Sequence, residues 1–110
     1  MIQQYVPDKG VTVTIKKVIP FGAGLAGNSV DAAAIIRGID KLFNLNLSLQ
    51  EMQKLGVKFG ADIPYCLIDQ PAFIEGIGDK ITPFEFDFSK YKVLLVNTRE
   101  YISTEDIFTG

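Results

Sequence analysis

The sequence predicts an α+β fold in which helices pack on one side of a mixed sheet. Three observations carry this prediction. Polar and apolar residues alternate over residues 11–18, as they do in a half-exposed strand. Two later segments, 29–43 and 49–59, carry apolar residues at helical spacing. Short runs at 72–75 and 91–96 have the length of strands, and the second is expected to be buried.

The N-terminal elements follow from local patterns. Residues 1–6 resemble the end of a helix, and residues 7–10 (P-D-K-G) form a turn before the strand at 11–18. A glycine-rich loop then leads into the helix over 29–43, which is expected to end at Asn44.

Capping and turn signals define the elements that follow. Residues 48–51 (S-L-Q-E) are a capping box, which begins the second helix, and Gly56 weakens that helix without breaking it. Residues 60–64 are a turn, residues 76–79 are a tight turn, and Ser103 is a candidate cap for a helix directly after it. The apolar face of the second helix is expected to comprise Leu49, Met52, Leu55 and Phe59.

The composition limits the class of protein. The chain has 110 residues, of which 47% are hydrophobic, so it can form the core of one small domain. Its net charge of −2 argues against a nucleic-acid-binding protein, which normally carries a basic face. The sequence shows neither a signal peptide nor a long apolar run, so a soluble cytoplasmic protein is expected.

The residue types also exclude several kinds of chemistry. With no histidine in the chain, any general base must be a carboxylate, a lysine or a tyrosine. Zinc chemistry is disfavoured, since zinc sites need histidines or paired cysteines. Cys66 is the single cysteine, which excludes an internal disulfide, and its apolar neighbours favour a buried core thiol over a reactive one.

The strongest functional signal lies in residues 19–34. Three glycines, Gly22, Gly24 and Gly27, are followed by the small polar pair at 28–29 and an alanine-rich helix start. Glycines let the backbone turn tightly and leave no Cβ between it and a ligand. The start of the helix adds N–H groups and a positive dipole end. The loop therefore predicts a phosphate cradle in a protein that handles a nucleotide.

Two other interpretations of the loop are open. Residues 22–27 match the dinucleotide fingerprint G-x-G-x-x-G. Three observations oppose that interpretation. The preceding strand alternates polar and apolar residues, whereas a central parallel strand is apolar throughout. Pro20 and Phe21 separate the strand from the glycines, and the first helix leads to a second helix instead of a second strand. The loop is otherwise a glycine-rich turn without a ligand. It is not a Walker A loop, because no Lys-Ser/Thr pair follows Gly27.

The loop and two later motifs resemble those of the GHMP kinases, a family of small-molecule kinases with the phosphate-binding motif P-x-G-A-G-L-x-S-S-A. Residues 24–33 (G-L-A-G-N-S-V-D-A-A) resemble the variant G-L-A-G-G-S-S-D-A-A of one branch. Residues 59–67 (F-G-A-D-I-P-Y-C-L) and 75–80 (E-G-I-G-D-K) resemble that branch's G-A-D-V-P-F-C-L segment and glycine turn, in the same order. The branch phosphorylates a hydroxyl of a cytidine diphosphate-linked polyol in non-mevalonate isoprenoid biosynthesis.

The resemblance implies phosphoryl transfer from ATP with Mg²⁺. It makes Asp62 the candidate catalytic residue that accepts or orients the hydroxyl proton, although an aspartate there also suits a capping position. It makes Ser29 a candidate contact for magnesium or a phosphate oxygen. The residues expected to bind ATP are Pro20, Gly22, Ala23, Gly24, Leu25, Ala26, Gly27, Asn28 and Ser29. The residues expected at the acceptor substrate are Gly76, Gly78, Asp79 and Phe108, for which a plain hairpin turn and a core phenylalanine are the structural alternatives.

The charged and variant residues around the loop have simple interpretations. Asp31 favours the first turn of the helix through the dipole, and Lys16 and Lys17 are interpreted as a solvated strand end. Asn28 stands where the family usually has glycine, and Val30 stands where a second serine is usual. Together with the missing ends expected from the family resemblance, these two departures suggest a diverged or degraded copy.

By the same resemblance, residues 1–110 are part of the ATP-binding domain of a GHMP kinase, of the ribosomal protein S5 domain 2-like fold. The start of the linker to a C-terminal domain is expected near 98–110. The N-terminal strand and the C-terminal domain of a complete member are expected to be missing, so that exposed sheet edges make the isolated chain poorly soluble or oligomeric. The functional alternatives are another small-molecule GHMP kinase and an inactive nucleotide-binding remnant.

Overall fold

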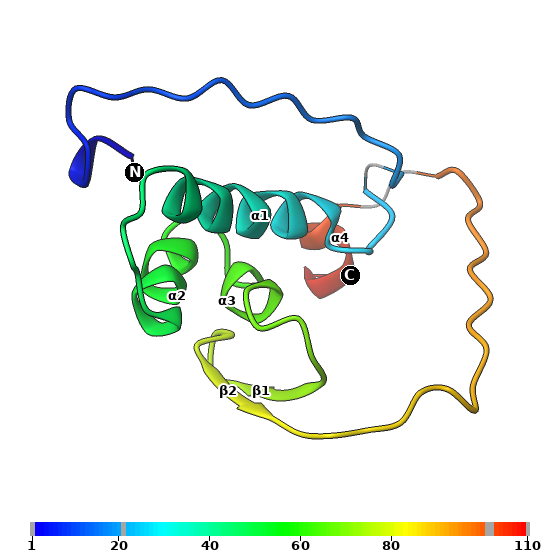
Figure 1. Cartoon of the computed structure of the whole chain (residues 1–110). Helices are drawn as coiled ribbons and strands as arrows, with labels where there is room; N and C mark the ends of the chain where they lie inside the picture. Colours follow the sequence, from blue (N-terminus) through cyan, green and yellow to red (C-terminus); the bar gives the residue numbers. More distant parts are fainter. Residues whose placement is uncertain (1, 21, 101–102, 110) are drawn as a thin grey trace.

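Three helices packed against one another form the centre of the computed structural model, which describes residues 2–20, 22–100 and 103–109 (Figure 1). A short 3-10 helix precedes them, and a hairpin and a last short helix follow. In chain order the elements are η1 (Ile2–Gln4), α1 (Gly27–Leu42), α2 (Leu49–Val57), α3 (Ile63–Cys66), β1 (Ala72–Glu75), β2 (Lys80–Pro83) and α4 (Thr104–Thr109).

The core lies between α1 and α3, with α2 against both. The predicted apolar spacing of α1 is confirmed, because this helix buries Ala33, Ile36 and Ile39. Ala33 and Ile36 pack with Ile63 and Leu67 of the α3 segment, and all four side chains are at most 5% exposed. Partly buried Ala32, Met52 and Cys66 surround this cluster. The predicted burial of Cys66 is therefore only partial.

The boundaries of α1 and α2 differ slightly from the predicted ones. Helix α1 begins at Gly27, two residues earlier than expected, after Ala26 in a left-handed conformation with φ 54°. Helix α2 begins at the predicted capping box: the Ser48 Oγ accepts from the Glu51 N–H, and a Glu51 carboxylate oxygen accepts from the Ser48 N–H. Phe59 is not part of the α2 apolar face, since α2 ends at Val57 and Phe59 is 66% exposed.

Helix α3 forms where a simple turn was expected over 60–64. Its start follows Asp62, and Pro64 occupies the first turn, where the missing N–H of proline costs no helical hydrogen bond. Gly56, a poor helix former within α2, is needed where α2 meets α3. A Cβ on it would lie 2.6 Å from the Cγ2 of Ile63. The glycine lets α2 and α3 approach closely.

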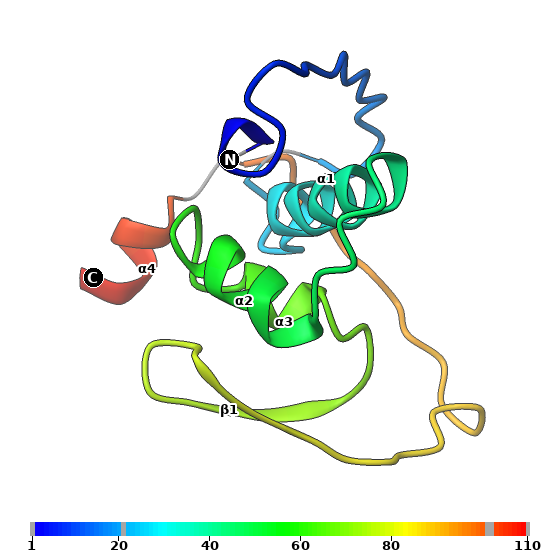
Figure 2. The same ribbon diagram turned by 60° about the vertical axis from the view of Figure 1, so that its left-hand side comes forward.

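The predicted turn at 76–79 joins β1 and β2 in an antiparallel hairpin, with Glu75 opposite Lys80 and Ala72 opposite Pro83. In both views the hairpin lies on the side of α2 and α3 that faces away from α1 (Figures 1 and 2). The expected mixed sheet is wrong for the described residues, whose strands form this two-stranded antiparallel sheet.

The predicted strands at 11–18 and 91–96 are also wrong. Both segments are extended, but neither is hydrogen-bonded into a sheet within the described part of the chain. The first runs along α1 and the second lies apart from it at the edge of the chain, and they are not paired with each other (Figure 1). The second segment is not buried, since the side chains of residues 93–96 (V-L-L-V) within it are 68–87% exposed. The alternation and apolar character that suggest strands are real, but a strand also needs a neighbouring backbone. The expected self-association of the isolated chain stays a prediction.

Replacing Ser48 with alanine should lower the free energy of unfolding by about 1 kcal/mol, because the change removes the acceptor at the start of α2. Urea unfolding followed by circular dichroism would measure this loss. Gln50→Ala, in the same turn, is the matched control and should leave the midpoint nearly unchanged. Equal midpoints for wild type and Ser48→Ala would contradict the prediction.

Candidate active site

The glycine loop adopts the conformation that only a glycine-rich sequence allows readily. Gly22 and Gly24 have φ angles of 69° and 72°, in the left-handed region that side chains with a Cβ rarely occupy. Ala26 is also left-handed, and α1 begins directly after it. The Val30 N–H donates to the Ala26 carbonyl at 3.0 Å. The N–H groups of residues 27–29 lie in the first turn of α1, where α-helical geometry offers them no backbone acceptor.

One cavity of about 270 Å³ brings this loop together with Asp62. Residues that are more than thirty positions apart in the sequence therefore border the same space. Its lining contains every residue predicted to bind ATP. The complete lining is Lys17, Pro20, Gly22, Ala23, Gly24, Leu25, Ala26, Gly27, Asn28, Ser29 and Asp62.

Asp62 stands at the position before the first residue of α3, but its carboxylate does not cap that helix. It makes no side-chain capping hydrogen bond, and the residue is exposed. The capping interpretation of this aspartate therefore lacks the bond that would define it. Asp62 borders the cavity that the glycine loop also lines.

Lys17 is a site residue that the sequence reasoning missed. Instead of being solvated alone, its Nζ donates to the Asp31 carboxylate at 2.6 Å and to the Asn28 side-chain oxygen at 3.0 Å. A Cβ added to Gly27 would lie 3.6 Å from the Nζ, so the charge sits at the first residue of α1. The signal was the basic pair directly before the glycine loop. Lys17 therefore places an ammonium group, paired with Asp31, at the border of the cavity.

The hairpin turn lies next to the residue that precedes Asp62. Gly78 of this turn contacts Ala61 closely enough that a Cβ on Gly78 would lie 2.6 Å from the Ala61 carbonyl oxygen. Gly76 and Asp79 complete the turn, and none of the three residues lines the cavity of the glycine loop. Phe108 falls within α4, but its side chain lies outside the described residues.

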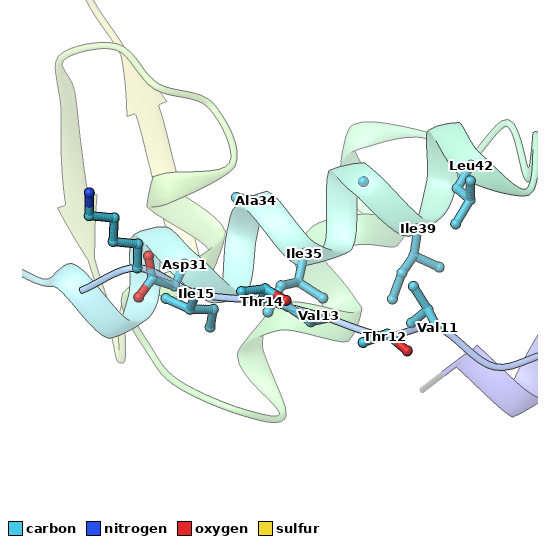
Figure 3. A pocket seen from close by; sticks show the side chains of 12 residues that line it. Val11, Thr12, Val13, Thr14, Ile15, Asp31, Ala34, Ile35, Ile39 and Leu42 are labelled. Carbon is cyan, nitrogen blue, oxygen red and sulfur yellow. The ribbon is translucent and has the colours of Figure 1, made fainter. Parts of the chain in front are cut away.

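A larger groove of about 590 Å³ runs between the extended segment 11–16 and α1 (Figure 3). Its walls are mostly aliphatic, with Val11, Val13 and Ile15 on one side and Ile35, Ile39 and Leu42 on the other. It contains neither the glycine loop nor Asp62. Polar groups that converge on one point define a reactive site better than volume does, so the smaller cavity is the candidate active site.

The described residues contain no group of three or more His, Cys, Asp or Glu side chains that could hold a metal ion. Magnesium in nucleotide sites is commonly held by one or two protein oxygens together with substrate phosphates. Ser29 and Asp62, which border the same cavity, can supply such oxygens.

Comparison with known families decides between the interpretations of the loop. The profile of the GHMP kinases N terminal domain matches residues 1–76. The chain belongs to the GHMP kinase family. The dinucleotide-binding interpretation of the glycine loop is thereby excluded, and the kinase resemblance of the loop is confirmed.

Curated relatives of this GHMP kinase chain carry a more specific name. The chain is 46% identical over 100 residues to a 4-diphosphocytidyl-2-C-methyl-D-erythritol kinase of Caldicellulosiruptor saccharolyticus. It is 41% identical over 100 residues to the kinase of the same name from Alkaliphilus oremlandii. A kinase of the same name from Caldicellulosiruptor bescii is 40% identical. Each match covers 91% of this chain and 34–35% of the relative. The chain therefore spans about a third of the length of these relatives.

The described helices of this GHMP kinase chain include none long and apolar enough to cross a membrane.

Cys66 reports on the charge at Asp62. Burial raises the pKa of the Cys66 thiol, and the negative charge of Asp62 raises it further, while Arg37 opposes the shift. A raised pKa leaves less thiolate at a given pH, so iodoacetamide should alkylate Cys66 more slowly than free cysteine in mildly alkaline buffer. Asp62→Asn should move the alkylation profile toward lower pH, as measured by mass spectrometry. A native thiol that reacts as fast as the urea-unfolded one would contradict this prediction.

Proposed function

We propose that this chain is part of a kinase that transfers the terminal phosphate of ATP to the hydroxyl of 4-diphosphocytidyl-2-C-methyl-D-erythritol, in non-mevalonate isoprenoid biosynthesis. The observation that carries the proposal is the single cavity shared by the glycine loop and Asp62. The names of the curated relatives support the choice of substrate. Membership of the GHMP kinases supports the use of ATP.

The proposed ATP-binding residues are those of the loop from Pro20 to Ser29, with Phe21 outside the described residues. The left-handed backbone at Gly22 and Gly24 turns the loop around the phosphates, and the first N–H groups of α1 bind their oxygens. Lys17, which is paired with Asp31 beside the start of α1, is proposed to offer its ammonium group to the phosphates as well. Magnesium, when bound with ATP, neutralises the charge that develops on the phosphates, and Ser29 contributes an oxygen to hold it.

The proposed role of Asp62 is to accept or orient the proton of the acceptor hydroxyl. Phosphoryl transfer depends mainly on positioning and on stabilisation of charge, so one carboxylate beside the phosphate loop suffices for this task. A carboxylate is also already deprotonated near neutral pH, so it can accept a proton without first losing one, unlike lysine or tyrosine. The acceptor substrate is proposed to approach from the side of the hairpin turn that contains Gly76, Gly78 and Asp79, and to contact Phe108.

The full-length protein should transfer label from [γ-³²P]ATP to the cytidine diphosphate-linked polyol in the presence of Mg²⁺. The acceptor panel includes the same polyol phosphate without the cytidine group, homoserine, mevalonate and galactose. Transfer to one of the other acceptors would instead identify another small-molecule GHMP kinase. Binding of Mg-ATP with no transfer to any acceptor would identify a non-catalytic nucleotide-binding protein.

A matched pair of glycine variants tests the loop separately from turnover. Neither Gly24 nor Gly10 has another group within 4 Å of an added Cβ, but only Gly24 has a positive φ and lies in the loop. Gly24→Ala should therefore weaken ATP binding measured by calorimetry, whereas Gly10→Ala should not. Equal affinities would argue against a phosphate site at this loop.

A further inference from the structure

Asp62 is exposed, and its side chain makes no capping hydrogen bond, so the placement of its carboxylate depends on the backbone on either side of it. On the C-terminal side the chain is held by the helices. Ile63 is 3% exposed and packs against Gly56, and the Gln53 side chain donates to the Pro64 carbonyl at 3.2 Å. This half of the support belongs to the core.

On the N-terminal side the support comes from the hairpin. Ala61 is exposed, and Gly78 of the turn between β1 and β2 lies directly against its carbonyl group. A Cβ on Gly78 would be 2.6 Å from the Ala61 oxygen, 3.4 Å from its carbonyl carbon and 3.6 Å from its Cβ. Gly78 also has a φ of 103°, which side chains with a Cβ strongly disfavour. The contact therefore requires glycine for two independent reasons.

The other residues of the turn hold Gly78 in this place. The Asp79 carboxylate accepts from the Ile77 N–H at 3.2 Å, and the Gly78 N–H donates to the Glu75 carbonyl at 3.3 Å. Gly76 has a φ of 69°, and a Cβ on it would lie 2.5 Å from the same Asp79 oxygen. Hydrogen bonds within the turn therefore hold its backbone, and Gly78 is the residue of the turn that contacts Ala61.

A shift at this contact reaches Asp62 through one rigid unit. The Ala61 carbonyl, the Asp62 nitrogen and the Asp62 Cα lie in a single peptide plane, because the peptide bond resists rotation. A Cβ on Gly78 would force a shift at this contact, and any displacement of the Ala61 oxygen tilts this plane. The tilt redirects the bond from the Asp62 Cα to its side chain.

We propose that Gly78 is a positioning residue for catalysis: it supports the Ala61–Asp62 peptide and thereby aims the Asp62 carboxylate at the acceptor hydroxyl. The proposal rests on the proposed function of Asp62. It gives the hairpin turn a role that acts through the backbone of Ala61.

The test is a double-mutant cycle on the full-length kinase, with kcat and both KM values measured by phosphate transfer. Gly78→Ala should lower kcat by roughly 10- to 100-fold and leave the KM for ATP unchanged, because misplacement of a reacting group costs this much rate. In the Asp62→Asn background, where there is no carboxylate to aim, Gly78→Ala should change the residual kcat less than about 2-fold. Gly38→Ala is the control, since an added Cβ there meets nothing within 4 Å.

The outcomes separate this inference from the proposed function. If Asp62→Asn lowers kcat but Gly78→Ala lowers it by the same factor in both backgrounds, the glycine acts independently and the positioning role is wrong. If Asp62→Asn has no effect on kcat, the proposed role of Asp62 fails instead, and the positioning role fails with it.

A second variant covers the case in which Gly78→Ala does not fold. Asp79→Ala removes an exposed carboxylate that holds the turn through the Ile77 N–H, and it leaves the core untouched. A positioning role predicts a lower kcat with little change in the KM for the acceptor, again lost in the Asp62→Asn background. A raised acceptor KM with unchanged kcat would show that the turn binds substrate directly, and it would overturn the positioning role.

Discussion

Replacing Asp62 with asparagine should lower kcat by about 10²–10⁴-fold while the affinity for Mg-ATP stays nearly the same. The factor is the usual contribution of a positioned acid or base to a proton transfer. Asparagine keeps the shape of aspartate but cannot accept the hydroxyl proton. ATP affinity is expected to survive because the contacts proposed for the phosphates come from the loop at 22–29 and from Lys17.

The assay compares single-turnover phosphate transfer with calorimetric binding of Mg-ATP. Asp69→Asn is the matched control, since Asp69 is exposed, lies outside the cavity and has a φ of 51°, which asparagine tolerates well. Stability should not change for Asp62→Asn, because the Asp62 side chain makes no capping bond. A kcat within a few fold of wild type would remove Asp62 from the mechanism.

Replacing Ile36 with alanine should lower the free energy of unfolding by about 2–5 kcal/mol, the range for buried isoleucine and leucine truncations. Ile36 is 3% exposed and sits at the centre of the cluster that joins α1 to α3. Few of the described side chains are deeply buried, so a loss of this size is a large part of the total stability of a small domain. Urea unfolding followed by circular dichroism would measure it.

Leu42→Ala is the control for this core truncation. Leu42 lies in the same helix but is 61% exposed. Its substitution should cost about 0.5 kcal/mol or less. Similar losses for Ile36→Ala and Leu42→Ala would show that the packing between α1 and α3 does not determine the stability.

Local signals in the sequence predicted most helices and turns correctly. The capping box at Ser48 fixes the start of α2, the apolar spacing of α1 selects the buried face, and the glycines at 76 and 78 form the expected hairpin turn. Each of these features depends on residues within a few positions of one another. Side-chain caps, helical periodicity and permitted φ angles are properties of the local chain, so they can be read without a structure.

The strands at 11–18 and 91–96 show where such signals fail. Both segments have the composition of strands, yet neither is paired within the described residues, because pairing depends on which other backbone comes alongside. The same limit explains Gly56 and Lys17. The sequence suggested that Gly56 only weakens a helix, but in the fold it lies against Ile63. The sequence also suggested that Lys17 is a solvated side chain, but in the fold it pairs with Asp31.

By itself, the sequence predicted the family, the proposed phosphate-binding loop and the candidate aspartate, because these lie in short motifs whose glycines and small side chains have few uses. Only the tertiary structure decided that the loop and Asp62 border one cavity, that Lys17 pairs with Asp31 beside it, and that Gly78 lies against the peptide before Asp62. The reason is physical: each of these relations is a contact between segments distant in the chain, and its distance is set by how the helices and the hairpin pack.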